Sequence, residues 1–267
     1  MSPRINKVAA IVGVILFAQA CSKVPITGRR QMNLVGESQL IGMAATQYGE
    51  FLGQNPPLPD NDQRVRMVRS VGSKLVTAAE QYLADNRASN RVEGFNWQFN
   101  VVNDNTVNAW CMPGGMVVVY TGILPVTQDE TGLAVVMGHE IAHAIARHGN
   151  ERMSQAIALQ GAGMTLEVLT SQKPGVARDI FLQSVGIGSQ LGMLAYSRTH
   201  ETEADKMGLI FMAMAGYDPR EAPKFWERMS QGGGPAPPEL LSTHPSDETR
   251  MHDLNEFMVE ALKYYRP

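Results

Sequence analysis

The sequence predicts an α+β fold that is mostly helical, with a small sheet beside one long helix near the middle of the chain. Apolar residues recur at helical spacing over most of the chain, whereas residues 95–124 hold strand-type runs around a Pro-Gly-Gly turn. A chain of 267 residues with 44% hydrophobic content can bury one sizeable core or two small ones. The net charge is −3 and no basic face is concentrated, so no nucleic-acid partner is expected.

The first 20 residues are typical of an export signal. Two basic residues precede residues 8–20, an apolar stretch shorter than the roughly 20 residues that a spanning helix needs. The stretch ends "AQAC", which resembles the lipobox of bacterial lipoproteins, although Ala18 stands where leucine is usual. We therefore expect a signal peptide over residues 1–20 and lipidation of Cys21, which would anchor an exported, periplasmic protein to a membrane. A plain secretory signal is the alternative.

Each later segment has its own pattern. Residues 21–36 carry Pro, Gly and basic residues and are expected to form a tether, so that the main domain spans residues 37–267. Residues 37–52 are weakly helical, and a proline-rich loop follows over residues 54–60. Residues 62–83 place valines and leucines near a 3.6-residue period, which predicts an amphipathic helix.

The strands and the central helix come next. Residues 95–104 alternate and predict a strand, and residues 108–124 predict strand, turn and buried strand. The strongest helix runs from Thr127, with Glu130 completing a capping box, to a stop at Gly149. The chain has only two cysteines, one of them in the expected signal region, so no disulfide framework is expected.

The second half is expected to be helical. Residues 154–195 predict two helices packed through small residues, with a mobile lid or a membrane-touching hairpin as the alternative. A further helix starts at residue 199 and ends at Gly216. Residues 232–238 form a flexible loop, and residues 246–264 a last helix with Ser246 as its cap.

The motif "HEIAH" places His139 and His143 four residues apart, on one face of the predicted helix. Two neutral imidazoles aimed at one ion suit zinc. Glu140 is rotated by about 100° from His139, which puts its carboxylate beside the metal, where it can take a proton from a water molecule. Chance is the alternative, but the motif sits mid-helix directly after the predicted hairpin.

Two histidines leave a catalytic zinc site incomplete, because such sites usually have three protein ligands. The residue six positions after His143 is a glycine, and His148 comes one position earlier, so we expect a supporting or helix-end role for His148. The segment "HETEAD" offers carboxylates: Glu201 and Asp205 share a helix face, and Glu203 lies about 200° from Glu201. Spacing alone does not choose between the two glutamates, and a solvated acidic turn is the alternative.

Several motifs together resemble a known family. The quoted segments are "HEIAH", "ETEAD", "VPITGRRQ", "NAWCMPGGMVVVYTGIL", "AGYDP" and "STHPSDETR". They resemble the gluzincin, or zincin-like, metallopeptidases related to the CAAX prenyl protease and HtpX, and among these the soluble Oma-like and BepA-like branch. The likeness covers residues 24–260. The CAAX-protease and HtpX members have several membrane spans that this chain lacks, so prenyl-peptide processing is not expected.

The resemblance implies a role for each matching residue. His139, His143 and Glu201 would bind one Zn2+, with Glu140 as general base and acid. Asp205 would orient a metal-binding imidazole.

Residues outside the two main motifs also gain roles. His244 matches a histidine that approaches the metal as a latent ligand or stabilises the tetrahedral intermediate, with a surface turn as the alternative, and Arg250 matches an arginine near the site. Peptide substrates would add to an edge strand that begins at Asn108, Ala109 and Trp110.

The expected function is that of a zinc-dependent metalloendopeptidase that degrades unfolded, misfolded or misassembled envelope proteins. A chaperone-like assembly factor with a latent zinc site is one alternative. A zinc hydrolase that acts on non-peptide substrates is another, although the predicted edge strand favours peptides.

Overall fold

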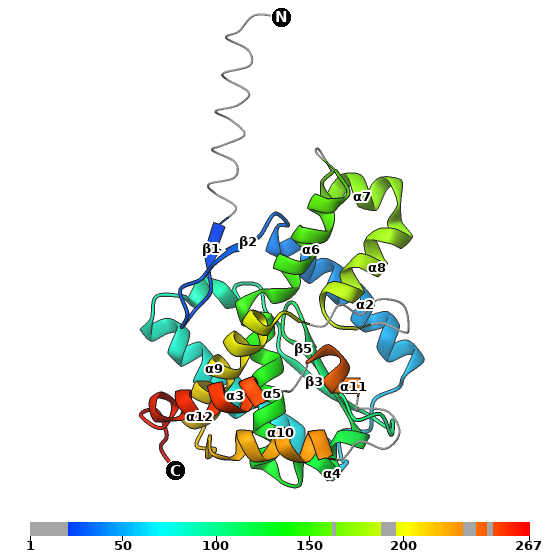
Figure 1. Ribbon diagram of the computed structural model, residues 1–267. Coiled ribbons are helices and arrows are strands. Elements are labelled where there is room, and N and C mark those ends of the chain that lie inside the picture. The colour runs from blue at the N-terminus through cyan, green and yellow to red at the C-terminus, as the bar shows by residue number, and fades with distance from the viewer. Residues whose placement is uncertain (1–20, 162–163, 188–195, 232–238, 245–247) are drawn as a thin grey trace, which may run out of the picture.

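The computed structural model of the chain describes residues 21–161, 164–187, 196–231, 239–244 and 248–267 (Figure 1). The expected signal peptide, the loop over residues 232–238 and the expected cap Ser246 lie outside the described residues. In the described part no helix has the length and apolar character that crossing a membrane requires. Helices dominate and the sheets are small, which confirms the predicted α+β class.

A three-stranded sheet with the order β3-β5-β4 lies beside the central helix. Its strands are β3 (Gln98–Val102), β4 (Ala109–Met112) and β5 (Met116–Tyr120), so the predicted strand and hairpin are confirmed with shorter bounds. β5 runs parallel to β3 and antiparallel to β4, which leaves β4 at an edge. The turn before β5 requires glycine, because Gly115 has a φ of +85° and a Cβ there would lie 2.6 Å from the Trp97 ring.

The sheet separates two apolar cores, because alternate residues of each strand point to opposite faces. Val117 and Val119 belong to the core shared with α3 (Gln63–Asp85), α5 (Glu130–Ala146) and α9 (Arg198–Met214). Val118 and Trp110 belong to the core shared with α2 (Glu37–Gln54) and the helices after α5. Burial on both faces explains why β5 is an unbroken apolar run.

The central helix α5 begins later than the sequence suggested. Asp129 is its N-cap and accepts hydrogen bonds from the backbone N–H groups of Thr131 and Gly132. The predicted capping box of Thr127 and Glu130 was wrong, because the positive φ of Gln128 ends the short helix α4 (Leu124–Thr127) before α5 starts. The side chains of α5 are buried on nearly every face, which makes it the core helix of the domain.

The predicted stop at Gly149 was also wrong. Arg147 takes a left-handed φ of +61° and ends α5, and α6 (His148–Leu159) begins at the next residue. Gly149 lies inside α6, where a Cβ would meet Val185 at 3.0 Å. The sharp bend at Arg147 therefore brings His148 back toward the face of α5 that carries His143.

The segment expected to be a tether is folded onto the domain. β1 (Cys21–Lys23) and β2 (Arg30–Met32) pair antiparallel, and we call residues 21–32 the N-terminal hairpin. Val24 is 1% exposed within the first core, and Gln31 is 2% exposed. The stretch was expected to be a tether because it contains Pro, Gly and polar residues and shows no periodic apolar pattern. It is folded because its one buried apolar residue and several polar residues find their partners in distant parts of the chain, which local patterns do not indicate.

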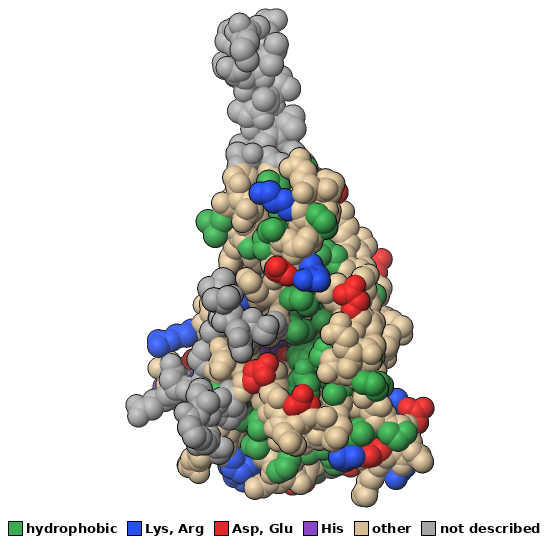
Figure 2. All heavy atoms as spheres, turned by 90° about the vertical axis from the view of Figure 1, so that its right-hand side faces the viewer, with side chains coloured by type: hydrophobic (Ala, Val, Ile, Leu, Met, Phe, Trp, Pro, Cys, Tyr) green, Lys and Arg blue, Asp and Glu red, His purple; other side chains and the backbone are tan. Residues whose placement is uncertain are grey.

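The remaining helices surround the two cores. The helices are α7 (Leu166–Gln172), α8 (Pro174–Ser184), α10 (Glu221–Gln231), α11 (Glu239–Thr243) and α12 (Glu248–Ala261), with 3-10 turns at Ser89–Val92 and Thr121–Ile123. Two helices were expected over residues 154–195, and the described part of that region contains the end of α6 followed by α7 and α8. The last helix, expected over residues 246–264, is α12, which has shorter bounds. Hydrophobic side chains gather along the middle of the face that includes α2 and α8 (Figure 2).

Candidate metal centre

Four buried side chains able to bind metal converge between α5, α9 and the end of α11: His139, His143, Glu201 and His244. One donor atom of each lies within 4.8 Å of the others, and none of the four residues is more than 4% exposed. Nε2 of His139 lies 3.0 Å from Nε2 of His143 and 3.1 Å from Nδ1 of His244. In the described part of the chain no second group of metal-binding side chains is as close. The structure therefore brings together the three residues that the resemblance implied as ligands, and it places His244 beside them, where the resemblance implied a latent ligand.

His139 is oriented by an ion pair behind it. Its Nδ1 lies 2.9 Å from a carboxylate oxygen of Asp205. Arg250 donates hydrogen bonds of 2.7 and 2.8 Å to the two oxygens of that carboxylate. Burial raises the pKa of Asp205, but the Arg250 charge and the His139 hydrogen bond outweigh it and keep the pKa below its ordinary value. An ionised carboxylate only accepts, so Nδ1 of His139 carries a proton. Burial lowers the pKa of the His139 ring, but Glu201 and Asp205 outweigh it and raise the pKa; in the neutral form, which binds metal, Nε2 has its lone pair facing the cluster.

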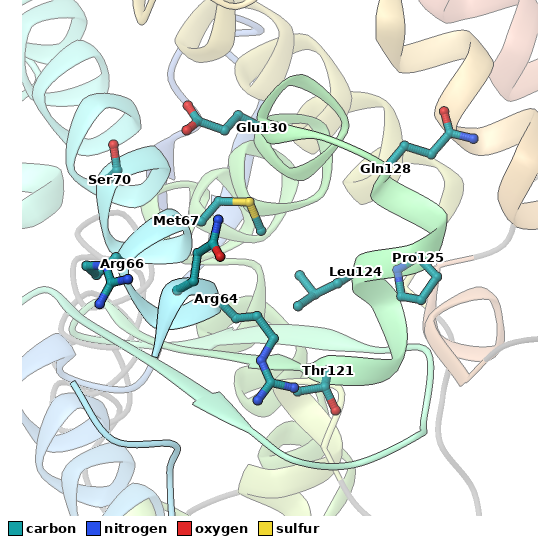
Figure 3. A pocket seen from close by; sticks show the side chains of 10 residues that line it. Arg64, Arg66, Met67, Ser70, Thr121, Leu124, Pro125, Gln128 and Glu130 are labelled. Carbon is teal, nitrogen blue, oxygen red and sulfur yellow. The ribbon is translucent and has the colours of Figure 1, made fainter. Parts of the chain in front are cut away.

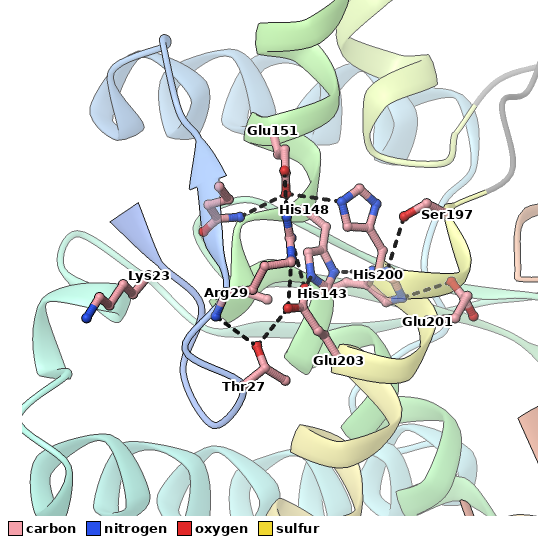
Figure 4. A network of polar contacts seen from close by, with 12 residues as sticks. Lys23, Thr27, Arg29, His143, His148, Glu151, Ser197, His200, Glu201 and Glu203 are labelled. Atoms are coloured by element: carbon pink, nitrogen blue, oxygen red, sulfur yellow. Dashed lines mark hydrogen bonds and ion pairs between the residues drawn. The ribbon is translucent and has the colours of Figure 1, made fainter. Parts of the chain in front are cut away.

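His143 is oriented by a second histidine. Its Nδ1 lies 2.9 Å from Nδ1 of His148, whose Nε2 lies 3.0 Å from an oxygen of Glu203 (Figure 4). Burial lowers the pKa of His148 to about 4, so its ring is neutral at pH 7. With Glu203 as acceptor, His148 carries its proton on Nε2 and accepts at Nδ1 from His143. Nε2 of His143 is then also a lone pair facing the cluster.

These two lone pairs test whether a metal fits. At 3.0 Å, two lone pairs on Nε2 of His139 and Nε2 of His143 repel each other, and either a proton on one ring or a metal ion between the rings relieves this repulsion. The carboxylate of Glu201 lies 3.4 Å from each of the two nitrogens. Two neutral imidazoles and one carboxylate in a buried position are a donor set that zinc prefers. The residues therefore fit one zinc ion.

Glu140 lies against this cluster without being one of its members. One oxygen lies 3.4 Å from Nε2 of His244, and that oxygen accepts no hydrogen bond among the described residues. Burial raises the pKa of Glu140 to about 7, and the nearby Glu201 carboxylate adds to the rise, while His244, Arg250 and the backbone N–H of Cys111 oppose it. A carboxylate with this pKa is suited to take up and release a proton near neutral pH.

Arg250 connects several parts of the centre. Its guanidinium lies 3.0 Å from Glu201 and 3.6 Å from the centre of the Trp226 ring, besides pairing with Asp205. Burial raises the pKa of Glu201, but electrostatic interactions with His244, Arg250 and His139 outweigh it and hold the pKa well below its ordinary value. Glu201 is therefore ionised and available as a ligand.

Sequence reasoning missed several neighbours of the cluster. Tyr196 stacks on His244 with ring centres 5.0 Å apart and tilts over His143 at 4.1 Å. Arg29 of the N-terminal hairpin pairs with both Glu203 and Glu151, behind His148 (Figure 4). No local spacing could have found these residues, because their partners lie far away in the sequence. The only signal was the segment "GRRQ" within a motif shared with the family.

The expected substrate strand lies at the predicted place. β4 is at the sheet edge, and the structure describes no other strand paired with its outer side. Asn108 donates to Glu239 and accepts from the backbone N–H of Ala109. The Trp110 ring points away from the cluster into the second core, where it packs edge-on against Phe51.

A surface pocket lies apart from this centre. Residues of α3, α4 and the start of α5 line it, including Arg64, Met67, Leu124 and Glu130 (Figure 3). None of its lining residues is a histidine or cysteine, and Arg64 is already paired with Asp62. The pocket therefore offers no metal site of its own, and the chemistry of the described residues is concentrated at the cluster.

The chain matches a family model and curated proteins. The model of "Peptidase family M48" matches residues 67–258. "Mitochondrial metalloendopeptidase OMA1" of Arabidopsis thaliana is 37% identical over 88% of this chain and 44% of that protein. The protein of the same name from Schizosaccharomyces pombe is 33% identical over 93% of this chain and 70% of that protein.

A bacterial relative has a different name. "Beta-barrel assembly-enhancing protease" of Escherichia coli (strain K12) is 27% identical over 89% of this chain and 47% of that protein. The chain thus spans about half the length of several curated relatives that it matches. These likenesses confirm the Oma-like and BepA-like resemblance.

Proposed function

Because the chain belongs to peptidase family M48, we propose that it is a zinc-dependent endopeptidase whose ion is held by His139, His143 and Glu201. The convergence of these three donors, with the imidazole lone pairs turned inward, carries the proposal. When bound, zinc supplies Lewis acidity that activates water and polarises the peptide carbonyl. The protein supplies everything else: orientation, proton transfer and exclusion of solvent.

Glu140 is the proton carrier of this proposal. Its carboxylate takes a proton from the attacking water and later passes it to the leaving amine. The raised pKa supports both halves of this task, because a group that titrates near neutral pH can accept and donate in one cycle. Burial keeps the exchanged proton away from bulk water, since Glu140 is 4% exposed.

His244 has two possible positions in this scheme. As it stands, Nδ1 lies among the donor atoms and Nε2 faces Glu140, so His244 occupies the space that an attacking water needs. We propose that this is a latent state, and that substrate displaces His244. In the open state either His244 or Arg250 would stabilise the oxyanion.

We propose that substrates bind as an added strand on β4. No described strand pairs with its outer side, where the backbone N–H of Ala109 donates to the Asn108 side chain and that of Cys111 donates to Glu140, and a substrate strand would take the place of these contacts. A peptide that pairs there passes close to the proton carrier, and backbone pairing makes few demands on side chains. This mode suits unfolded, misfolded or misassembled proteins.

The expected export signal and Cys21 lipidation support a place in the periplasm, on a bacterial membrane, with envelope proteins as substrates. The bacterial relative's name, which mentions β-barrel assembly and a protease, agrees with this proposal. Other relatives are named as mitochondrial, so the compartment rests on the sequence signals alone.

The experiment compares cleavage of casein, an unfolded protein, by the full chain purified with zinc in a mild detergent, beside Glu140→Gln. We expect the variant to keep its zinc and lose at least about 100-fold in rate. Equal cleavage by both would remove Glu140 from the mechanism, and a protein that retains no zinc would overturn the metal site. The latent position of His244 favours a second candidate, a chaperone-like factor. That function would leave both proteins inactive as proteases but equally able to keep casein soluble.

A further inference from the structure

We infer that Arg29 and Glu203 are positioning residues for the metal ligand His143, acting through His148, so that the N-terminal hairpin is part of the metal centre. This inference rests on the proposed zinc site. It assigns a role to Glu203, the glutamate of "ETEAD" that is not part of the cluster. It also assigns a role to a hairpin that lies far from the central helices in the sequence.

The first step is the path from Glu203 to the ligand atom. Glu203 accepts from Nε2 of His148, and Nδ1 of His148 accepts from Nδ1 of His143. Each acceptor fixes where the next ring carries its proton. The path ends at Nε2 of His143, which keeps a lone pair for the metal only while both hydrogen bonds hold.

The second step is what holds Glu203. Arg29 reaches across two carboxylates at once: its Nε and Nη2 lie 2.9 Å from the two oxygens of Glu203, and its Nη1 and Nη2 lie 2.8 and 2.6 Å from those of Glu151. Thr27 adds a hydrogen bond of 2.7 Å to Glu203 (Figure 4). Two bidentate pairs fix the carboxylate plane as well as its charge.

The third step is the parallel with the other histidine ligand. Asp205 lies behind His139 and is paired with Arg250. In the same way Glu203, paired with Arg29, lies behind His143, but here His148 lies between the carboxylate and the ligand. Each imidazole is thus backed by a carboxylate that an arginine neutralises. Such outer partners of metal ligands matter for affinity.

Removing Arg29 has a definite consequence for the path. Glu203 and Glu151 then lose the arginine between them, and Glu203 keeps only Thr27 and His148 as partners, so its acceptor position for His148 is less well fixed. His148 becomes free to carry its proton on Nδ1, opposite Nδ1 of His143. Two donors cannot pair, so His143 is driven to carry its proton on Nε2, the atom that must bind the metal.

The experiment measures the zinc dissociation constant of the full chain in mild detergent, by competition with a chromogenic chelator. The variants are Arg29→Ala, Glu203→Gln and His148→Ala. The matched control is Arg228→Ala: the Arg228 side chain is 25% exposed and pairs with Glu221, against 27% for Arg29. We expect the three variants to bind zinc about 10-fold more weakly or worse, and the control to bind as the parent does. Thermal unfolding of the metal-free proteins separates lost positioning from lost folding, and Glu203→Gln keeps the side-chain shape should Arg29→Ala unfold.

Each outcome is decisive. If the parent chain binds no zinc, the proposed function itself fails. If the parent binds zinc and Glu203→Gln, His148→Ala and the control all match it, the path does not position His143 and the inference is overturned. Weaker binding in the variants, with metal-free stability no lower than that of the control, supports it.

Discussion

Gly138 and Gly208 touch backbone to backbone where α5 and α9 pack against each other. A Cβ at Gly208 would lie 3.1 Å from the carbonyl carbon of Gly138 and 3.1 Å from the backbone nitrogen of His139. Because the obstacle is backbone, it cannot turn aside as a side chain would. The contact sets the distance between the helix that carries the two histidine ligands and the helix that carries Glu201.

Gly208→Ala is therefore expected to force the two helices apart. The predicted cost is about 1–3 kcal/mol in the free energy of unfolding, together with weaker zinc binding, since the donors separate. Urea unfolding and chelator competition check both parts. Gly42→Ala, at an exposed helical glycine with open space around it, is the control and should stabilise by about 0.5–1 kcal/mol. Unchanged zinc affinity in Gly208→Ala would mean that this contact does not set the site.

His244→Ala tests the latent state. If His244 keeps about nine molecules in ten closed, its removal raises the rate of casein cleavage about 10-fold. The geometry behind this expectation is Nε2 of His244 at 3.4 Å from Glu140, in the place of the attacking water. The double variant with Glu140→Gln shows that the added activity belongs to this site. A fall in rate would instead assign His244 to the oxyanion.

Arg250→Ala leaves two buried carboxylates, Asp205 and Glu201, without their cation. We expect a loss of about 3–5 kcal/mol in the free energy of unfolding, measured by urea denaturation. Arg250→Lys keeps the charge but not the paired hydrogen bonds and should lose less. Arg220→Ala, in an exposed pair with Asp218, is the control and should cost about 0–1 kcal/mol. Equal losses at both sites would contradict the role of burial.

Glu203 makes the stability of the chain depend on pH. Burial raises its pKa, but hydrogen bonds from His148, Arg29 and Thr27 outweigh it and bring the pKa to about 2, against an ordinary value of 4.5. Because the pKa of Glu203 is lower in the folded state than in the unfolded state, its ionisation stabilises the folded state at pH values above the unfolded pKa. That contribution is lost as pH falls from about 4.5 toward about 2. Metal-free Glu203→Gln should therefore lose less stability than the parent over this range. Parallel pH curves from urea unfolding would count against it.

The spacing of the sequence predicted the centre of the site because both motifs lie on helices. His139 and His143 share a face by helical periodicity alone, and Glu201 and Asp205 do the same on α9. Periodicity could not choose Glu201 over Glu203, because that choice depends on how α9 is rotated against α5. The packing of Gly208 on Gly138 fixes that rotation.

The sequence predicted that the main domain begins at residue 37, and local patterns gave no sign that the N-terminal hairpin before it is folded onto the domain. Arg29 and Glu203 are 174 positions apart, and nothing near either residue indicates the pairing. The start and stop of α5 were missed for a related reason: the positive φ values of Gln128 and Arg147 fall on residues with no special preference for them. Such conformations are set by tertiary packing.

The ionised groups around the cluster also have a charge balance. Glu201 and Asp205 are held ionised and Arg250 supplies one positive charge, whereas Glu140, with a pKa of about 7, adds a negative charge only when it is deprotonated. These carboxylates therefore exceed the arginine by one or two negative charges, in an interior that tolerates them poorly. A bound divalent cation offsets this excess of negative charge. Metal loading is thus coupled to folding: a chelator that strips the ion would lower the melting temperature of the whole domain.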